Sequence, residues 1–106
     1  MHTGALILTD NENAILIYKF VNYQTISYRI DMYTTDLYTY IFLNDDNTIT
    51  LNLKQGNLHG EIIEDKYTYD LNFTEFTIRL QNLFKNYNTN IGNELLTNIQ
   101  KDLNNY

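Results

Sequence analysis

Residues 25–43 read TISYRIDMYTTDLYTYIFL, and this stretch decides the fold. Two runs of alternating side chains, 25–33 and 37–43, lie on either side of the polar triplet Thr34-Thr35-Asp36. Alternation with a period of two is typical of β-strands, and a short polar break between two such runs is typical of an antiparallel connection. The sequence therefore predicts two neighbouring antiparallel strands here.

The same alternation continues on both sides of this hairpin. The polar turns DNEN (10–13) and NDDN (44–47) and the pair Gly56-Asn57 separate further apolar runs. A Gly-X pair suits a two-residue hairpin turn because glycine tolerates positive φ. Consecutive strands with short connections pair as a meander, with 25–33 and 37–43 in the middle of the sheet. We expect the other strands at about 5–9, 14–21, 48–55, 58–64 and 66–73.

The period of the apolar residues changes at Thr74, where two amphipathic helices are predicted. The first, about 74–87, has Thr74 as its expected N-cap, with Phe73 and Ile78 placed as a hydrophobic staple. Its apolar stripe consists of Phe76, Leu80, Leu83, Phe84 and Tyr87. The second, about 91–104, has a stripe made of Ile91, Leu95, Ile99 and Leu103, with Leu96 beside it.

These patterns predict an α+β fold: an antiparallel β-meander of about six or seven strands followed by two C-terminal α-helices packed on one sheet face. The nearest alternative arrangement is a β-barrel with a C-terminal helix, similar to pleckstrin-homology domains. We expect one core from residues of both helices and the central strands, namely Ile30, Ile41, Leu51, Leu80, Leu83 and Leu95.

The length of 106 residues suits one domain, spanning 1–106, with one core. The chain has no cysteine, which excludes disulfides and thiolate metal sites and fits a reducing cytoplasm. No apolar run approaches the ~20 residues that a membrane helix needs. We therefore expect a cytoplasmic protein that neither crosses nor binds a membrane.

Thirteen acidic and seven basic residues give a formal net charge of −6. Affinity for nucleic-acid phosphates comes mostly from lysine and arginine, so direct nucleic-acid binding is not expected. The acids are also too few and too dispersed to imitate a full DNA duplex, which carries one charge per ~1.7 Å, unless most of them gather on one face. Partial occlusion of a basic groove stays an alternative. A protein with a basic surface is the partner that this charge favours.

Four tyrosines between residues 28 and 40 raise the question of whether they fill the core, stack on bases or bind a protein. Base stacking needs basic residues beside the rings, whereas the neighbours here are aspartates. Tyrosine is enriched in protein interfaces, and aspartates beside it can pair with a partner's lysine or arginine. Core packing stays the alternative for each ring. The predicted partner-binding residues are Asp31, Tyr33, Asp36, Tyr38, Tyr40, Asp45 and Asp46.

No arrangement of residues typical of catalysis is found. The two histidines, His2 and His59, have no partner at triad spacing, and Ser27 lies within a strand without the glycines of a nucleophile elbow. The acidic segments 10–13 and 44–47 lack the order of a calcium loop and are interpreted as turns. We expect no catalytic, cofactor-binding or metal-binding residues, and not an enzyme.

The abundance of asparagine, isoleucine and tyrosine resembles that of proteins from AT-rich genomes, among which small acidic proteins of phages and mobile elements are frequent. This resemblance and the charge lead to the hypothesis of a binding inhibitor that blocks a basic surface of a host nucleic-acid-handling or defence enzyme, such as a nuclease or CRISPR effector, in the host cytoplasm. The alternatives are an immunity or chaperone-like protein that neutralises a toxin, and a small structural homo-oligomer.

Overall fold

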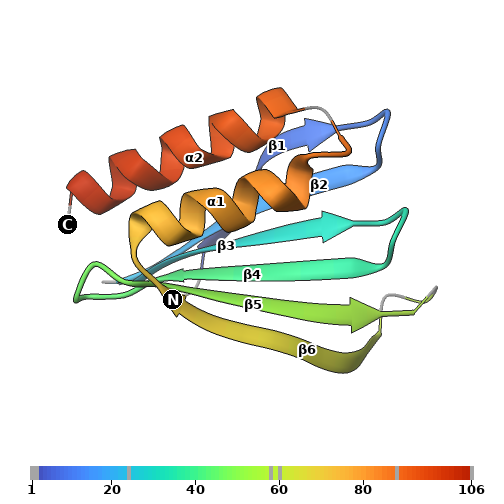
Figure 1. Cartoon of the computed structure of the whole chain (residues 1–106), viewed down its shortest axis with the longest axis horizontal. Helices are drawn as coiled ribbons and strands as arrows, with labels where there is room; N and C mark the ends of the chain where they lie inside the picture. The colour runs from blue at the N-terminus through green and yellow to red at the C-terminus, as the bar shows by residue number, and fades with distance from the viewer. Residues whose placement is uncertain (1–2, 24, 58, 60, 88, 106) are drawn as a thin grey trace.

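The computed structural model describes residues 3–23, 25–57, 59, 61–87 and 89–105. Six strands form one antiparallel sheet, and two helices follow them (Figure 1). The predicted α+β meander with two C-terminal helices is therefore confirmed. The elements are β1 (Thr3–Asp10), β2 (Ile15–Asn22), β3 (Thr25–Met32), β4 (Leu37–Leu43), β5 (Ile49–Gly56), β6 (Ile62–Leu71), α1 (Phe73–Phe84) and α2 (Thr89–Asn104).

The hairpin of residues 25–43 lies at the centre of the sheet, as predicted. The strand order is β1-β2-β3-β4-β5-β6, so each strand pairs with its neighbours in the chain and β3 and β4 lie in the middle. Tyr28 pairs with Ile41, and Arg29 pairs with Tyr40. The sheet is open, because β1 and β6 form its two edges. The barrel alternative is therefore wrong.

The last part of the sheet differs from the sequence-based prediction. One strand, β6, replaces the two strands expected at 58–64 and 66–73, because two register shifts against β5 leave Ile63 and Lys66 without a paired residue and let the pairing continue. The two-residue turn expected at Gly56-Asn57 is also wrong. The Asn57 side chain instead accepts hydrogen bonds from the backbone N–H groups of His59 and Glu61 and shapes a longer loop. Leu58 and Gly60, from the first expected strand, lie outside the described residues.

The N-cap of the first helix lies two residues earlier than the sequence suggested. Asn72, not Thr74, is the N-cap: its side chain accepts from the Glu75 backbone N–H at 2.8 Å, and Glu75 Oε1 accepts from the Asn72 N–H at 3.1 Å. This reciprocal pair is a capping box. With Asn72 as the cap, Leu71 and Phe76 take the positions of a hydrophobic staple, and both are buried.

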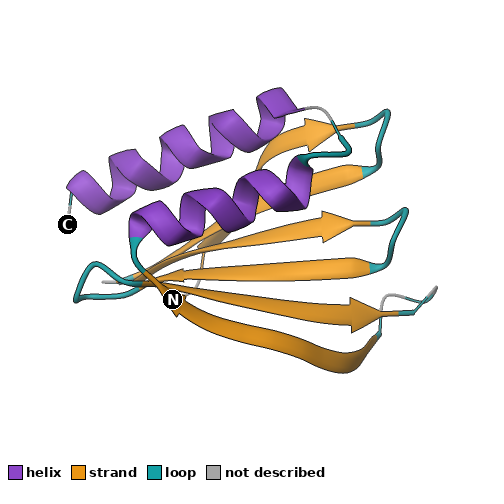
Figure 2. Ribbon diagram, in the orientation of Figure 1, coloured by secondary structure: helices purple, strands orange, loops and turns teal. Residues whose placement is uncertain are grey.

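Both helices lie on the same face of the sheet (Figure 2). Their predicted apolar stripes are confirmed, since the core residues of α1 are Phe76, Leu80 and Phe84 and those of α2 are Ile91, Leu95 and Ile99. Leu83 is only partly buried, at the margin of the core. From the sheet, the core takes Ile15, Ile17, Tyr28, Ile30, Met32, Ile41, Leu43, Ile49, Leu51 and Leu71.

Neither of the two described helices covers the other face of the sheet, and we call it the open face (Figure 2). The register and the alternation of the strands place on it Leu6, Tyr18, Phe20, Arg29, Asp31, Tyr38, Tyr40 and Phe42. Within the described part of the chain, no helix is long and apolar enough to cross a membrane.

Candidate partner-binding face

Aromatic side chains from two strands converge on the open face around a single arginine. Arg29 in β3 pairs across the sheet with Tyr18 of β2 on one side and with Tyr40 of β4 on the other. Its guanidinium carbon lies 5.9 Å from the ring centroid of Tyr18, 5.7 Å from that of Tyr38 and 5.8 Å from that of Tyr40. Cation–π attraction at these distances fixes three rings around one charge.

Asp31 holds this arginine in place. Its Oδ1 accepts from Arg29 Nε at 2.6 Å, and its Oδ2 accepts from the Tyr33 hydroxyl at 3.1 Å. The hydrogen bond to Asp31 raises the pKa of Arg29, so the guanidinium stays charged. Only 1% of Asp31 is exposed, and the carboxylate is already paired. Asp31 therefore organises the open face from beneath its surface, and its charge is balanced within the protein.

Tyr38 has a supporting position below the surface. It is 2% exposed, and its ring meets that of Tyr33 edge to face, with centroids 6.1 Å apart. On its other side the ring lies against Gly56, where any Cβ would overlap it. Burial raises the pKa of the Tyr38 hydroxyl, and the Asp31 charge adds to this effect.

Tyr33 and Tyr40 are accessible on the open face. Tyr33 is 45% exposed, and partial burial, followed by the charge of Asp31, raises its pKa to about 12. Tyr40 is half-buried between Arg29 and Lys54, whose Nζ lies 5.9 Å from the ring centroid. Both rings therefore offer apolar area on the open face.

Further apolar residues of the open face were missed by the sequence-based prediction. Phe42 is 43% exposed and Leu6 is also exposed, while Tyr18 and Phe20 are half-buried with ring centroids 6.4 Å apart. Gly4 in β1 lets the Phe20 ring lie close to the backbone, because a Cβ there would meet the ring. The alternation in residues 14–21 already placed Tyr18 and Phe20 on one face, so that signal could have found them.

The predicted carboxylates do not form one cluster. Asp36 lies in the β3–β4 turn, and Asp45 and Asp46 lie in the β4–β5 turn, at the other end of the sheet (Figure 1). The seven residues of β4 separate them, which corresponds to ~23 Å of extended chain. Asp46 accepts from the Thr48 hydroxyl at 2.6 Å, and this bond lowers the Asp46 pKa. The open face thus has an aromatic centre with acids at two ends.

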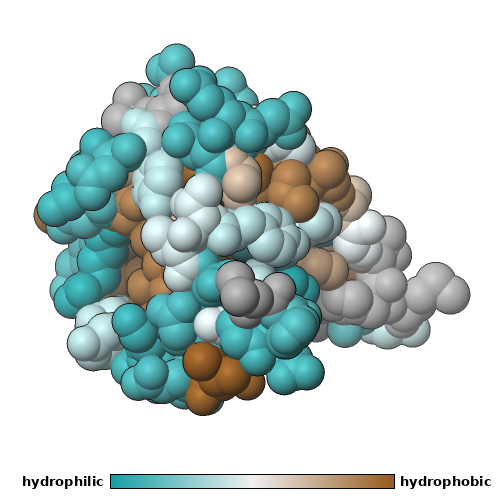
Figure 3. Space-filling view, turned by 90° about the vertical axis from the view of Figure 1, so that its right-hand side faces the viewer, coloured by the Kyte–Doolittle hydropathy of each residue, from teal (hydrophilic) through white to brown (hydrophobic). Residues whose placement is uncertain are grey.

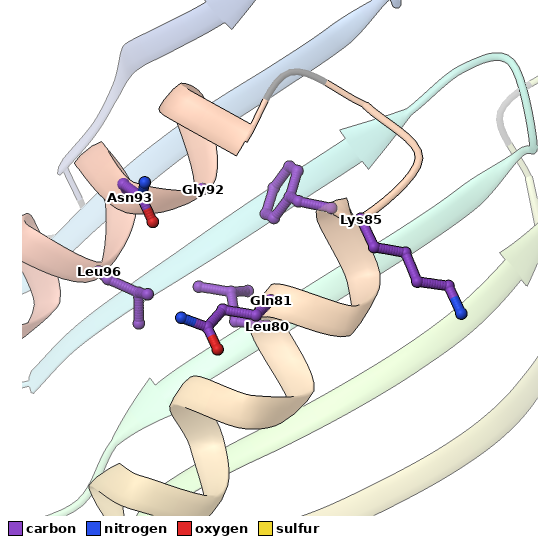
Figure 4. Close-up of a pocket in the computed structure, with 7 residues that line it drawn as sticks. Leu80, Gln81, Lys85, Gly92, Asn93 and Leu96 are labelled. Atoms are coloured by element: carbon purple, nitrogen blue, oxygen red, sulfur yellow. The ribbon is translucent and has the colours of Figure 1, made fainter.

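A cavity, separate from the open face, lies between the two helices and is drawn in Figure 4. This cavity of about 310 Å³ has an apolar wall formed by Leu80, Phe84 and Leu96, with Gln81 and Asn93 at its rim. Lys85, the charged residue that lines it, extends away from the other labelled side chains. The lining therefore contains no acid–base pair. Among the described residues, no group of three or more His, Asp or Glu side chains could hold a metal ion.

The comparisons with known proteins give no relative from which a role could be transferred. No protein-family model matches the chain, and no curated protein and no solved structure matches it significantly. The case for a function therefore rests on the open face itself.

Proposed function

We propose that this chain is a small binding protein that inhibits a partner by covering a basic functional surface with its open face. The observation that supports this proposal is the aromatic centre around Arg29 with carboxylates at both ends of the sheet. Protein interfaces have the same arrangement, with an aromatic and arginine-rich centre surrounded by a polar rim.

The size of the molecule is compatible with this role. Its principal dimensions are 36 × 29 × 24 Å. A stable interface buries ~800 Å² per partner, which is about one face of a domain of this size. Tyr40 and Phe42 would supply the desolvated centre, because both are accessible and stand on a central strand held by β3 and β5.

Charge favours a basic partner over a second copy of this chain. The net charge is −6, and Asp36, Asp45 and Asp46 have no ion pair among the described contacts. Two copies docked through this face would bring like charges together, whereas lysines and arginines of another protein would meet them favourably. A basic groove that handles nucleic acid, in a nuclease or a CRISPR effector of the host cytoplasm, fits this surface.

An immunity protein that neutralises a toxin would use the same face in the same way. The gene's neighbourhood separates the two roles: a toxin gene beside it indicates immunity, and a phage early-gene cluster indicates inhibition of host defence. In both roles the protein acts by occupying its partner, and no catalytic step is proposed.

The test is affinity capture from lysate of the native host, with mass spectrometry, using the wild type and three variants. Tyr40→Ala and Phe42→Ala remove central rings, and Tyr23→Ala is the matched control because Tyr23 is exposed in the β2–β3 turn. We expect one basic partner to be retained by wild type and by Tyr23→Ala. The other two variants should bind it with a loss of ~2 kcal/mol, which is about 30-fold in affinity.

Charge reversal of Asp45 and Asp46 to lysine supplies a second readout. Rim charges act mainly on association, so this variant should associate more slowly and with a weaker salt dependence. Thermal melting of every variant shows whether a loss of binding is a loss of fold. The proposal is wrong if all variants retain the same proteins, or if sedimentation shows self-association through the open face.

A further inference from the structure

The edge strand β6 has features of a second binding site, separate from the open face. It is the longest strand, with ten residues, and no described strand pairs with its outer edge. Every residue from Ile62 to Thr68 is exposed, including Ile63 at 63% and Tyr67 at 59%. Figure 3 views the end of the sheet where β6 begins and shows an apolar patch at its lower margin, surrounded by hydrophilic atoms.

Free strand edges are normally protected in soluble proteins by proline, by lysines, by bulges or by short length. The other edge, β1, has a bulge between Leu6 and Leu8 and contacts α2. In β6 the two bulges lie before Tyr67, so Tyr67–Leu71 remains a regular five-residue segment paired with Ile49–Leu53. The chain contains no proline, and Lys66 is the only lysine of this strand. The segment Tyr67–Leu71 is therefore an unprotected edge that can pair with another strand.

A groove lies beside this segment, on the helix face of the sheet. α1 begins next to the end of β6 and then runs away from it, which leaves the rest of the strand uncovered (Figure 1). The groove has a volume of about 300 Å³ and is lined from the sheet by Leu53, Tyr67 and Tyr69 and from α1 by Arg79 and Leu83. An added strand would place every second side chain beside this groove.

One polar group in the groove has no hydrogen-bond partner among the described residues. It is the hydroxyl of Thr39, which lines the groove and is fully buried. Arg79 lies over the ring of Tyr69, with its guanidinium carbon 3.8 Å from the centroid. This arginine would repel a cation in the groove, and Leu53 and Leu83 give its wall an apolar surface that suits apolar side chains.

On the open-face side, β6 has acidic side chains, in contrast to Arg79 on the groove side. Asp70 and Asp65 are on the open face, where Asp70 accepts from the Thr50 hydroxyl at 2.7 Å and Asp65 pairs with Lys54. With Glu61 and Glu64, the segment from Glu61 to Leu71 has four carboxylates and one lysine. A second copy of β6 would bring a second set of four carboxylates to the same edge, and this like charge disfavours a homodimer there.

We propose that β6 binds an extended segment of a partner protein by strand addition. The segment alternates apolar side chains, which enter the groove between α1 and β6, with lysine or arginine side chains, which lie beside Asp70. Backbone hydrogen bonds to the free edge of Tyr67–Leu71 supply the affinity, and the alternation supplies the specificity.

The test uses a capped nine-residue peptide of alternating lysine and valine, with binding followed by fluorescence anisotropy and amide hydrogen exchange. Two comparison peptides isolate the causes: one has N-methylated amides on one edge, and the other has glutamate in place of lysine. We expect the N-methylated peptide to bind at least about tenfold more weakly than the lysine peptide, because it has lost backbone donors. The glutamate peptide should not bind, and the lysine peptide should slow exchange of amides in Tyr67–Leu71.

Two protein variants with the same change in charge complete the test. Asp70→Asn should weaken binding of the lysine peptide by about threefold, as loss of one exposed ion pair does. Glu94→Gln, at an exposed position of α2, should not change it. Equal binding of the N-methylated peptide would overturn the proposal, since it would indicate non-specific charge attraction. Protection confined to other strands, absence of binding at millimolar peptide, or a dimer formed through β6 would overturn it as well.

Discussion

Asp102, near the end of α2, joins that helix to two strands of the sheet. It accepts hydrogen bonds from the Tyr28 hydroxyl and from Lys19 Nζ, the latter at 3.0 Å. Burial, together with the bond to Asp102, raises the pKa of Tyr28, so its hydroxyl remains a donor at all physiological pH values. The Asp102 side chain is only 12% exposed, which makes the pair with Lys19 better shielded than a surface ion pair.

Asp102→Ala should therefore destabilise the protein. The substitution leaves the Tyr28 hydroxyl and the Lys19 ammonium without their acceptor, at an expected cost of ~1–3 kcal/mol in the free energy of unfolding. Urea denaturation followed by circular dichroism measures this loss. Asp65→Ala is the matched control, because Asp65 also pairs with a lysine but is largely exposed. Equal urea midpoints for the two variants would show that the Asp102 contacts contribute nothing.

The roles of Asp31 and Tyr38 could not be predicted from the residues alone. The sequence pattern placed both on one face, which is correct, and both were predicted as partner-binding residues, with core packing as the alternative for the Tyr38 ring. Their burial depends on Arg29, which the register brings between three rings and which pairs with Asp31. Such a contact depends on side chains from three paired strands, so it cannot be predicted from the alternation within one strand.

At the scale of elements, substitutions at Asn72 and Thr74 distinguish the two possible N-caps of α1. Asn72→Ala should lower the free energy of unfolding by about 1 kcal/mol, since the side chain accepts from the Glu75 N–H. Thr74→Ala should change it little, because Thr74 is exposed within the first turn. Thermal and urea unfolding of the two variants measure the difference. A larger loss for Thr74→Ala would place the cap where the sequence suggested it.

Most elements were predictable because their patterns are local. Alternation in residues 25–43 and the helical stripes around Leu80 and Leu95 are properties of single segments. The two errors arose where non-local pairing decides the outcome. β6 remains one strand because β5 continues beside it and bulges absorb the extra residues, and both Asn72 and Thr74 are of a type that caps helices.

At the scale of the whole molecule, tyrosine ionisation should make stability depend on pH. Burial raises the pKa of Tyr28 and Tyr38 above 10.0, and partial burial raises that of Tyr33 to about 12. A group whose pKa is higher in the folded state stabilises that state below its unfolded pKa. This contribution is lost as the pH rises through the folded value. The stability from Tyr33 should therefore be complete below pH 10 and decline between pH 10 and 12.

Urea midpoints measured from pH 9 to pH 12 check this expectation. The wild type should lose stability across the interval, and Tyr33→Phe, which has no ionisable hydroxyl, should lose less. Tyr23→Phe is the matched control, because Tyr23 is exposed in a turn. If the urea midpoints of wild type and Tyr33→Phe fall in parallel as the pH rises, ionisation of Tyr33 does not contribute to the loss of stability.

The meander also has a consequence for the order in which the chain folds. Every strand pairs with its sequence neighbour, so the sheet needs only short loops to close and can assemble hairpin by hairpin during synthesis. The link between Lys19 and Asp102, in contrast, spans 83 residues. In a nascent chain that has not yet released α2 from the ribosome, the part of the core face that α2 covers would therefore still be exposed to water. That interval, rather than the pairing of strands, is when a chaperone or a protease would meet it.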